Sequence, residues 1–295
     1  MSFNDSQLDS LMPPLELTRR GFIVTALASG FAVAAGAVQA QTAIKTSDDG
    51  LTAGEVKIPA KDGEIPAYRA APAGQKDLPV ILVIQEIFGV HEYIKDVCRR
   101  LAKAGYLAIA PELFARQGDP ASYQDTSTLM RELVSKVPDA QVMQDLDATV
   151  AWAGTQGGDV ERLGITGFCW GGRITWLYAA HNARVKAGVA WYGRLQGDAT
   201  ELQPRHPIAV VDRLSAPVLG LYGGKDTGIP LESVEAMKAA LAKGSDAAKA
   251  SKFVIYDDAP HAFHADYRPS YRKEAAEDGW KQALTWFGER LKARP

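Results

Sequence analysis

A cysteine stands between glycines in the stretch GITGFCWGGR, residues 164–173. Gly167 lies two positions before Cys169 and Gly171 two positions after it, with an apolar run upstream and a helical pattern downstream. A strand that turns sharply into a helix strains the backbone at the middle residue, and flanking glycines relieve the crowding. Such a turn exposes the central side chain and aims the helix N-terminus at it, which favours a thiolate and a developing oxyanion. We therefore predict that Cys169 is a nucleophile.

An acid and a base follow the cysteine along the chain, each just after a predicted strand. Asp226 lies in GGKDTGIP, and His261 lies in DDAPHAFHADYR. The order nucleophile, acid, histidine is that of the α/β-hydrolase triad, in which the acid fixes the imidazole tautomer and the imidazole moves the proton. Asp257 and Asp258 are rival acids on the histidine's own strand end, and His264 is a rival base. The positions directly after strands favour Asp226 and His261.

A fourth loop, Gln85-Glu86-Ile87-Phe88-Gly89, follows a buried strand. In an α/β-hydrolase this loop supplies one oxyanion-hole amide, which we assign to Ile87. Trp170, the residue after the nucleophile, supplies the second amide. Glu86 is unusual, because it places an acid next to the predicted reaction centre.

Alternating strands and helices would bring these loops together. Residues 54–60 and 64–70 alternate polar and apolar side chains around a KDG turn, which predicts a hairpin. Further strands are expected at 80–84, 107–113, 162–168, 185–193, 216–224 and 251–259, and helices at 91–106, 120–157 with a break near Pro138, 170–182, 230–244 and 270–292. This alternation predicts one α/β domain over residues 41–295, with a mostly parallel central sheet, helices on both faces and an N-terminal hairpin. Ligands bind beyond the carboxyl ends of such strands, so the loops after Ile84, Thr166, Tyr222 and Tyr256 should carry the chemistry.

Composition excludes several classes of protein. The 295 residues are 46% hydrophobic and 23% charged, which is typical of a soluble globular protein. A net charge of -2 indicates neither a nucleic-acid nor a membrane-surface partner. Cys98 and Cys169 are the only cysteines, which excludes a disulfide scaffold and a Cys-x-x-Cys metal site. His261 and His264 are close in sequence, but no nearby cysteine supports a zinc site.

The first forty residues form a segment of a different kind. Thr18-Arg19-Arg20-Gly21-Phe22-Ile23 resembles a twin-arginine export motif, and an uncharged run follows as far as Ala40. The run ends in small residues of the type that a signal peptidase accepts, and it is weakly apolar for the alternative, a transmembrane anchor. We expect a twin-arginine-type signal peptide over residues 1–40, the twin-arginine export machinery as a partner, and a periplasmic or secreted mature chain.

Four stretches together carry a family resemblance: VILVIQEIFGVHEYI, GYLAIAPELFARQG, GFCWGGR and DDAPHAFHADYR. They resemble the dienelactone hydrolase family, also called carboxymethylenebutenolidases, in the same order over roughly residues 55–292. The combination of Gln-Glu-Ile-Phe-Gly with Gly-x-Cys-x-Gly-Gly is not that of a serine esterase. The resemblance implies an α/β-hydrolase fold without a metal or cofactor. It further implies cysteine-dependent hydrolysis of a small carboxylic ester or enol-lactone through an acyl-thioenzyme.

The resemblance also implies residue roles. It places the triad on Cys169, Asp226 and His261, and it gives Glu86 the task of holding the resting thiol away from the histidine until substrate displaces it. Such a masked thiol would also resist oxidation, because oxidation follows thiolate character.

One position departs from the family pattern. Family members carry an arginine four residues after the catalytic histidine that helps to bind a substrate carboxylate, and this chain has Ala265 there. We assign substrate binding to Arg268, the nearest arginine, and to Tyr192. The departure leaves two alternatives open: a general carboxylesterase or thioesterase acting on a neutral small substrate, and a non-catalytic binding protein on the same fold.

Overall fold

The computed structural model describes residues 44–292, so the predicted signal peptide lies outside the described residues. One eight-stranded sheet runs through the molecule in the order β1-β2-β4-β3-β5-β6-β7-β8. The strands are β1 (Leu51–Ala60), β2 (Gly63–Pro72), β3 (Leu78–Ile84), β4 (Leu107–Pro111), β5 (Gly158–Phe168), β6 (Val185–Trp191), β7 (Val218–Gly223) and β8 (Lys252–Tyr256). Strands β1 and β2 form the predicted antiparallel hairpin, β2 pairs antiparallel with β4, and every later pairing is parallel. This architecture is the α/β-hydrolase fold expected from the sequence.

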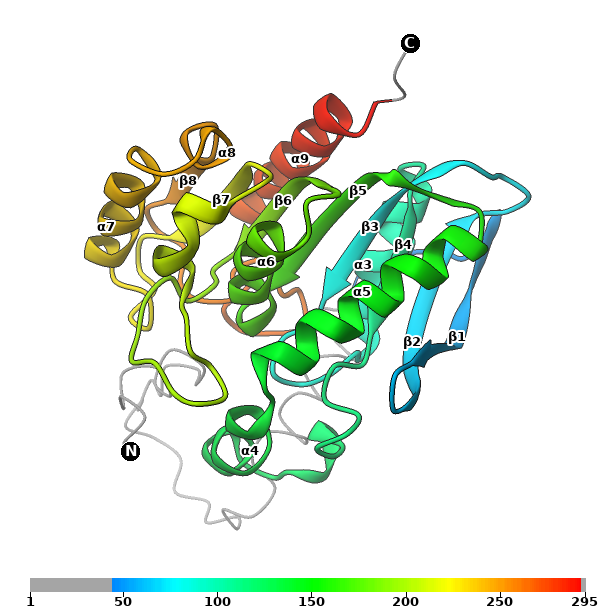
Figure 1. Ribbon diagram of the computed structural model, residues 1–295, viewed down its shortest axis with the longest axis horizontal. Coiled ribbons are helices and arrows are strands. Elements are labelled where there is room, and N and C mark those ends of the chain that lie inside the picture. The colour runs from blue at the N-terminus through cyan, green and yellow to red at the C-terminus, as the bar shows by residue number, and fades with distance from the viewer. Residues whose placement is uncertain (1–43, 293–295) are drawn as a thin grey trace, which may run out of the picture.

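Helices cover both faces of the sheet, as Figure 1 shows, with α5 and α6 in front of it and α3 and α9 behind it. The helices are α3 (Glu92–Lys103), α4 (Thr126–Glu132), α5 (Asp139–Thr155), α6 (Trp170–His181), α7 (Leu231–Leu241), α8 (Asp246–Lys249) and α9 (Lys273–Arg290), with short 3-10 turns at Pro120–Ser122, Val134–Lys136 and Pro207–Arg213. The predicted break near Pro138 is confirmed, because Pro138 is the N-cap of α5. The sequence did not predict the four-residue helix α8.

The core lies between the sheet and these two helical layers. The five residues Val80–Ile84 of β3 are all fully buried, because helices cover the strand on both sides. On α3, Ile94, Val97 and Leu101 form one buried stripe, as their spacing predicts. The burial of these two elements fixes where β3 ends, and therefore where the loop with Glu86 begins.

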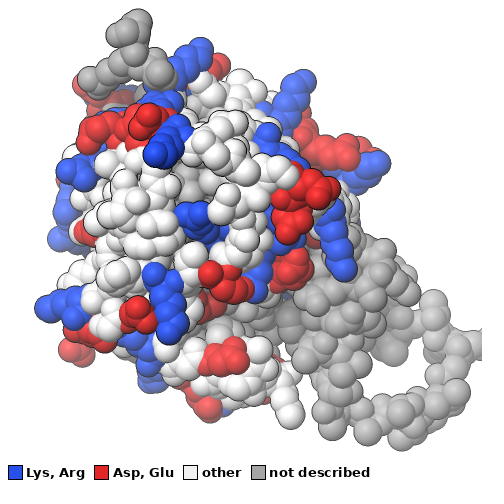
Figure 2. Space-filling view, turned by 90° about the vertical axis from the view of Figure 1, so that its right-hand side faces the viewer, with Lys and Arg blue, Asp and Glu red and all other residues white. Residues whose placement is uncertain are grey.

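The surface is mixed in charge. Figure 2 shows Lys and Arg side chains interspersed with Asp and Glu over the face that it displays. Between Ile44 and Lys292 no helix is both long and apolar enough to cross a membrane.

Candidate active site

Cys169 lies at a strained turn between β5 and α6. Its φ of 56° and ψ of -114° place a non-glycine residue in the left-handed half of backbone space, where side chains are uncommon. Its amide donates to the carbonyl of Trp191, 3.0 Å away at the end of β6, which fixes the turn against the neighbouring strand. The residue is the N-cap of α6, so its side chain lies beside the positive end of that helix.

This turn requires a glycine on each side of Cys169. A Cβ on Gly167 would lie 2.2 Å from the carbonyl oxygen of Gly171. A Cβ on Gly171 would lie 2.4 Å from the carbonyl oxygen of Ile84, at the end of β3. The spacing that suggested a nucleophile in the sequence therefore has a steric cause, because strand, turn and helix approach too closely for any side chain.

Asp226 and His261 meet at the carboxyl ends of β7 and β8. The Oδ2 atom of Asp226 lies 2.6 Å from Nδ1 of His261, and both side chains are buried. The other carboxylate oxygen accepts the amides of Gly228 at 2.9 Å and Ile229 at 3.1 Å. These contacts orient the carboxylate, and the carboxylate holds the proton of His261 on Nδ1. The Nε2 atom of His261 has no hydrogen-bond partner in the part of the chain that the structure describes.

The electrostatics of His261 favour its charged form. Burial alone would lower the pKa of the imidazole, but the carboxylate of Asp226 and the thiolate form of Cys169 together raise that pKa to about 10. The imidazole can thus hold a proton taken from the thiol.

The rival groups occupy other environments. His264 is buried among rings of Phe168, Trp191 and Trp280, and its Nδ1 lies 2.6 Å from the hydroxyl of Tyr93. Burial, with the positive charge of Arg100, lowers the pKa of His264 well below its ordinary value, so this ring is neutral.

Neither rival acid approaches the ring of His261. Asp258 is 90% exposed and pairs with Lys225 at 2.5 Å. Asp257 is exposed as well. The carboxylate that contacts His261 is that of Asp226.

The loop that carries the predicted oxyanion amide is fixed at both ends. Glu86 and Gly89 form an isolated antiparallel bridge around Ile87. The amide of Val90 donates to Oε2 of Glu112 at 2.7 Å, and the amide of Leu113 donates to Oε1 of Gln85 at 3.2 Å. Trp170 is the first residue of α6, so its amide has no acceptor within the helix.

Glu86 is buried and has three polar neighbours, Tyr267, His91 and Arg268. Its Oε2 accepts the hydroxyl of Tyr267 at 2.7 Å and lies 3.5 Å from Nε2 of His91. Burial would raise the pKa of this carboxyl, but His91, Arg268 and Tyr267 outweigh burial and lower it, so Glu86 is ionised. Its Oε1 has no hydrogen-bond partner within residues 44–292.

The two predicted substrate-binding residues both lie near Cys169, but only Tyr192 lines the cleft. Tyr192 lines the same cleft as Cys169, with a positive φ of 38° and its ring edge-on to His261 at 5.2 Å between centroids. Arg268 lies 5.8 Å from the ring centroid of Phe88 and does not line that cleft. Ala265 is fully buried and provides no charge.

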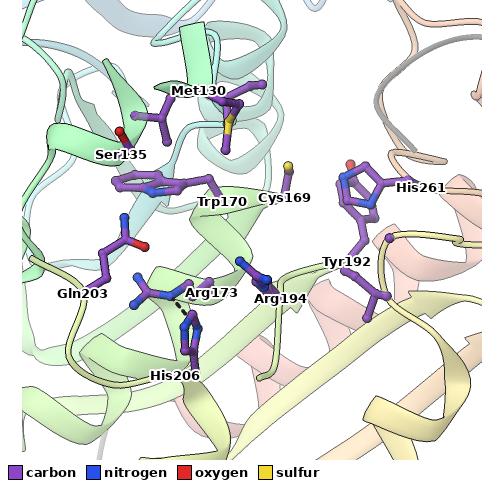
Figure 3. Close-up of a pocket in the computed structure, with 14 residues that line it drawn as sticks. Met130, Ser135, Cys169, Trp170, Arg173, Tyr192, Arg194, Gln203, His206 and His261 are labelled. Carbon is purple, nitrogen blue, oxygen red and sulfur yellow. Dashed lines mark hydrogen bonds between the residues drawn. The ribbon is translucent and has the colours of Figure 1, made fainter. Parts of the chain in front are cut away.

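A single cleft joins the thiol, the imidazole and several side chains that the sequence analysis missed (Figure 3). The fourteen residues that line it are Ile87, Met130, Val134, Ser135, Cys169, Trp170, Arg173, Tyr192, Arg194, Gln203, Gly228, Ile229, His206 and His261. Arg194 lies three residues after the end of β6, so the rule about strand ends could have found it. Arg173 lies one helical turn after the nucleophile, which could have indicated it too. Gln203 and His206 lie in an irregular loop without a sequence motif.

The described residues contain no group of three or more His, Cys, Asp or Glu side chains placed to hold a metal ion. Three residues that line the cleft, Trp170, Tyr192 and His261, each have a buried side-chain polar atom without a hydrogen-bond partner among residues 44–292. Buried polar groups are normally satisfied, so such a concentration is typical of a site that accepts a ligand.

Comparisons with known proteins agree with this geometry. The sequence profile described as "Dienelactone hydrolase family" matches residues 65–291. A protein of Methylorubrum extorquens, named provisionally as a carboxymethylenebutenolidase, is 62% identical over 288 residues, which cover 97% of this chain and 98% of that protein. An Escherichia coli K12 protein with the same provisional name is 56% identical over 267 residues, which cover 90% of this chain and 97% of that protein.

A solved structure is similar in both fold and sequence. The crystal structure of a provisionally named dienelactone hydrolase from Klebsiella pneumoniae superposes with a TM-score of 0.79 at 56% identity. The match covers 81% of this chain and 99% of that chain.

Proposed function

Because this chain belongs to the dienelactone hydrolase family, we propose that it hydrolyses a small carboxylic ester or enol-lactone with Cys169 as its nucleophile. The observation that carries the proposal is the 2.6 Å contact between Asp226 and Nδ1 of His261, which leaves Nε2 free in the cleft that Cys169 lines. A triad with this order and orientation is suited to acyl transfer.

The first step joins the thiol to the acyl group. Nε2 of His261 takes the thiol proton of Cys169, and the sulfur attacks the carbonyl carbon while the C=O π electrons move to oxygen. The carboxylate of Asp226 stabilises the imidazolium that forms, because its charge and that of the Cys169 thiolate outweigh burial and raise the pKa of His261 to about 10. The amides of Ile87 and Trp170 receive the oxyanion, a contribution of about 3–4 kcal/mol per donor in other acyl-transfer enzymes.

The remaining steps expel the departing oxygen and then hydrolyse the thioester. The tetrahedral intermediate breaks its C–O bond, and the departing oxygen receives the proton from Nε2 of His261. The neutral imidazole then takes a proton from water, and the resulting hydroxide attacks the thioester carbonyl. Breakdown of that intermediate breaks the C–S bond, the departing sulfur receives the proton from Nε2 of His261, and the acid and the thiol of Cys169 are released.

Glu86 is proposed to suppress the resting thiol. Its ionised carboxylate has an oxygen without a hydrogen-bond partner among the described residues and is buried beside the nucleophile loop. A nearby negative charge disfavours a thiolate, so iodoacetamide should alkylate Cys169 slowly in the free protein and faster in Glu86→Gln. Equal alkylation rates in the two proteins would contradict this role.

Ala265 favours a second candidate function. An apolar, buried residue at this position offers no cation to a substrate carboxylate, which fits a carboxylesterase or thioesterase for neutral substrates. A non-catalytic binding protein is the third possibility.

One experiment separates these functions. The full chain and its Cys169→Ala variant are assayed side by side on a dienelactone, an aryl ester and an acyl thioester. Cysteine-dependent turnover of the lactone supports the first function, and turnover of the ester or thioester alone supports the second. Activity that survives in Cys169→Ala would contradict the proposed nucleophile, and inactivity of both proteins would favour the binding protein.

Export by the twin-arginine machinery is proposed for the segment that precedes Gln41. Its support is the sequence Thr18-Arg19-Arg20-Gly21-Phe22-Ile23 and the uncharged run that follows. In a bacterial host, the full chain should be recovered from the periplasm in a shortened form. Replacement of Arg19 and Arg20 by lysine should retain it in the cytoplasm, and an unchanged distribution would contradict the proposal.

A further inference from the structure

The cleft has a charge imbalance on the side away from His261. Two arginines and two histidines line it, and none of its fourteen lining residues is an aspartate or a glutamate. Figure 3 shows Arg173 and Arg194 together on one side, below Trp170 and Cys169 in that view. The positive charges of these two arginines differ in how far nearby carboxylates neutralise them.

Arg173 already has its counter-ion. Its two terminal nitrogens donate to the two carboxylate oxygens of Asp139, each at 2.7 Å, and one of them also donates to the carbonyl of Arg205 at 2.7 Å. Its Nε lies 3.3 Å from Nδ1 of His206. A bidentate, buried pair of this kind is satisfied within the protein and has little left to offer a ligand.

Arg194 has no such partner. Its one hydrogen bond among the described residues runs from Nε to the carbonyl of Gln196 at 3.1 Å, and no carboxylate of residues 44–292 lies within ion-pair distance of it. Burial and the neighbouring charge of Arg173 lower its pKa, and the carboxylate of Asp198, which forms no ion pair with it, offsets them only in part. A half-buried guanidinium with free donors in a cleft favours an anion.

The loop that carries Arg194 is held firmly around the cleft. The amide of Asp139 donates to the carbonyl of Leu202 at 2.9 Å, and Nε2 of His206 lies 3.1 Å from the carbonyl of Asp198. A Cβ on Gly197 would lie 2.9 Å from Cζ of Arg194, so the loop packs directly against the guanidinium. Packing against this hydrogen-bonded loop therefore restrains the guanidinium of Arg194 at the cleft.

We propose that Arg194 is a specificity-determining residue that binds a carboxylate carried by the substrate ester, remote from the carbonyl that Cys169 attacks. This subsite lies in the loop after β6, the strand next to β5, whereas Ala265 lies in the loop after β8, two strands further toward the edge of the sheet. The inference rests on the proposed hydrolase function. The family resemblance already implies a carboxylate on the substrate, and the inference assigns its recognition to Arg194 and to the loop after β6.

A matched pair of substrates tests the subsite. The full chain is assayed on the 4-nitrophenyl ester of adipic acid and on the same ester with its free carboxylate capped by methyl. One charge-assisted contact predicts that kcat/KM is about ten- to a hundredfold higher for the free carboxylate. The ratio should fall toward one in Arg194→Gln, recover in part in Arg194→Lys, and shrink at high salt.

Arg184→Gln is the matched control, because Arg184 is an exposed arginine that faces Glu161 at 3.7 Å and lines no part of the cleft. The Arg184→Gln variant should keep the wild-type ratio of kcat/KM between the free-carboxylate ester and the methyl-capped ester. A wild-type ratio near one, or an Arg194→Gln ratio equal to that of wild type, would overturn the subsite.

A binding measurement keeps the subsite testable if neither ester is hydrolysed. Monomethyl adipate is titrated by calorimetry into Cys169→Ala protein with and without Arg194→Gln. A loss of about tenfold or more in affinity on Arg194→Gln supports the anion site even where the proposed hydrolysis fails. Equal affinities would overturn the site, whatever the protein hydrolyses.

Discussion

His261 and His264 lie three residues apart in the loop after β8, and both are buried, yet their surroundings push their pKa values in opposite directions. His261 faces Asp226 and lies near Cys169, and its pKa rises to about 10. His264 is packed among aromatic rings near Arg100, and its pKa falls well below 6.5. Burial opposes the charged form of both rings, so the presence of a carboxylate decides the difference.

The comparison separates chemistry from packing within one loop. The free Nε2 of His261 lies in the cleft, whereas His264 closes a contact between the loop and Tyr93 of α3. A histidine next to a predicted active site can thus be part of the core, and the partner of each ring nitrogen tells the two apart.

The largest expected effect distinguishes the two histidines in catalysis. His261→Gln should lower kcat/KM by about 10⁴-fold or more, because it removes the proposed acceptor of the thiol proton. His264→Phe should stay within about tenfold of wild type once it is folded, since its ring touches no reacting atom. Steady-state assays on an aryl ester measure both variants. A similar loss of kcat/KM in the two would contradict the assignment of catalysis to His261 and packing to His264.

The second-largest effect is expected for Asp226→Asn, which removes the carboxylate that raises the pKa of His261. Asp226→Asn should lower kcat/KM by about 10³- to 10⁴-fold and move the alkaline limb of the pH–rate profile to lower pH, because the pKa of His261 falls. A raised pKa contributes stability that is complete below 6.5 and lost as pH rises toward 10. The gap in unfolding free energy between wild type and Asp226→Asn should therefore narrow over that range, as urea titrations would measure. A gap that widens would contradict the assigned cause.

The third effect concerns stability and has the opposite pH dependence. His264→Phe leaves the buried hydroxyl of Tyr93 without its partner, at a cost of about 1–3 kcal/mol near neutral pH. Because the folded-state pKa of His264 is lowered, wild type loses stability as pH falls below 6.5, and the variant lacks this loss. The difference in unfolding free energy between wild type and His264→Phe should therefore narrow as the pH falls. A difference that stays constant would show that His264 does not titrate as inferred.

The smallest effect tests the rival acid. Asp258→Asn removes an exposed carboxylate whose partner is Lys225, so kcat/KM and the melting temperature should both match wild type within error. A marked loss of activity would place Asp258, and not Asp226, behind His261.

Much of the site was predictable because it follows strand ends. Gly-x-Cys-x-Gly has a steric origin that any sequence reader can recognise, and Asp226 and His261 each follow a strand in triad order. The same rule selects His261 over His264 without any knowledge of their surroundings.

The remaining features depend on contacts that sequence spacing does not encode. Glu86 meets Tyr267 across 181 positions, and Arg173 meets Asp139 across 34, so neither partner could be named in advance. Arg194 could have been located by its strand end, but its lack of a counter-ion is a property of the folded loop. The neutral state of His264 depends on rings from β5, β6 and α9.

The strand order has a consequence for how activity is acquired during folding. Strand β5, which ends one residue before Cys169, pairs with β3 on one side and β6 on the other, while His261 lies in the loop after β8, at the edge of the sheet. Glu86 and His261 therefore belong to segments that are synthesised far apart, and the site exists only when the long-range strand pairs have closed. Under the proposed mechanism, a partly folded chain has Cys169 but lacks the base that His261 supplies, so hydrolytic activity would report completion of the sheet.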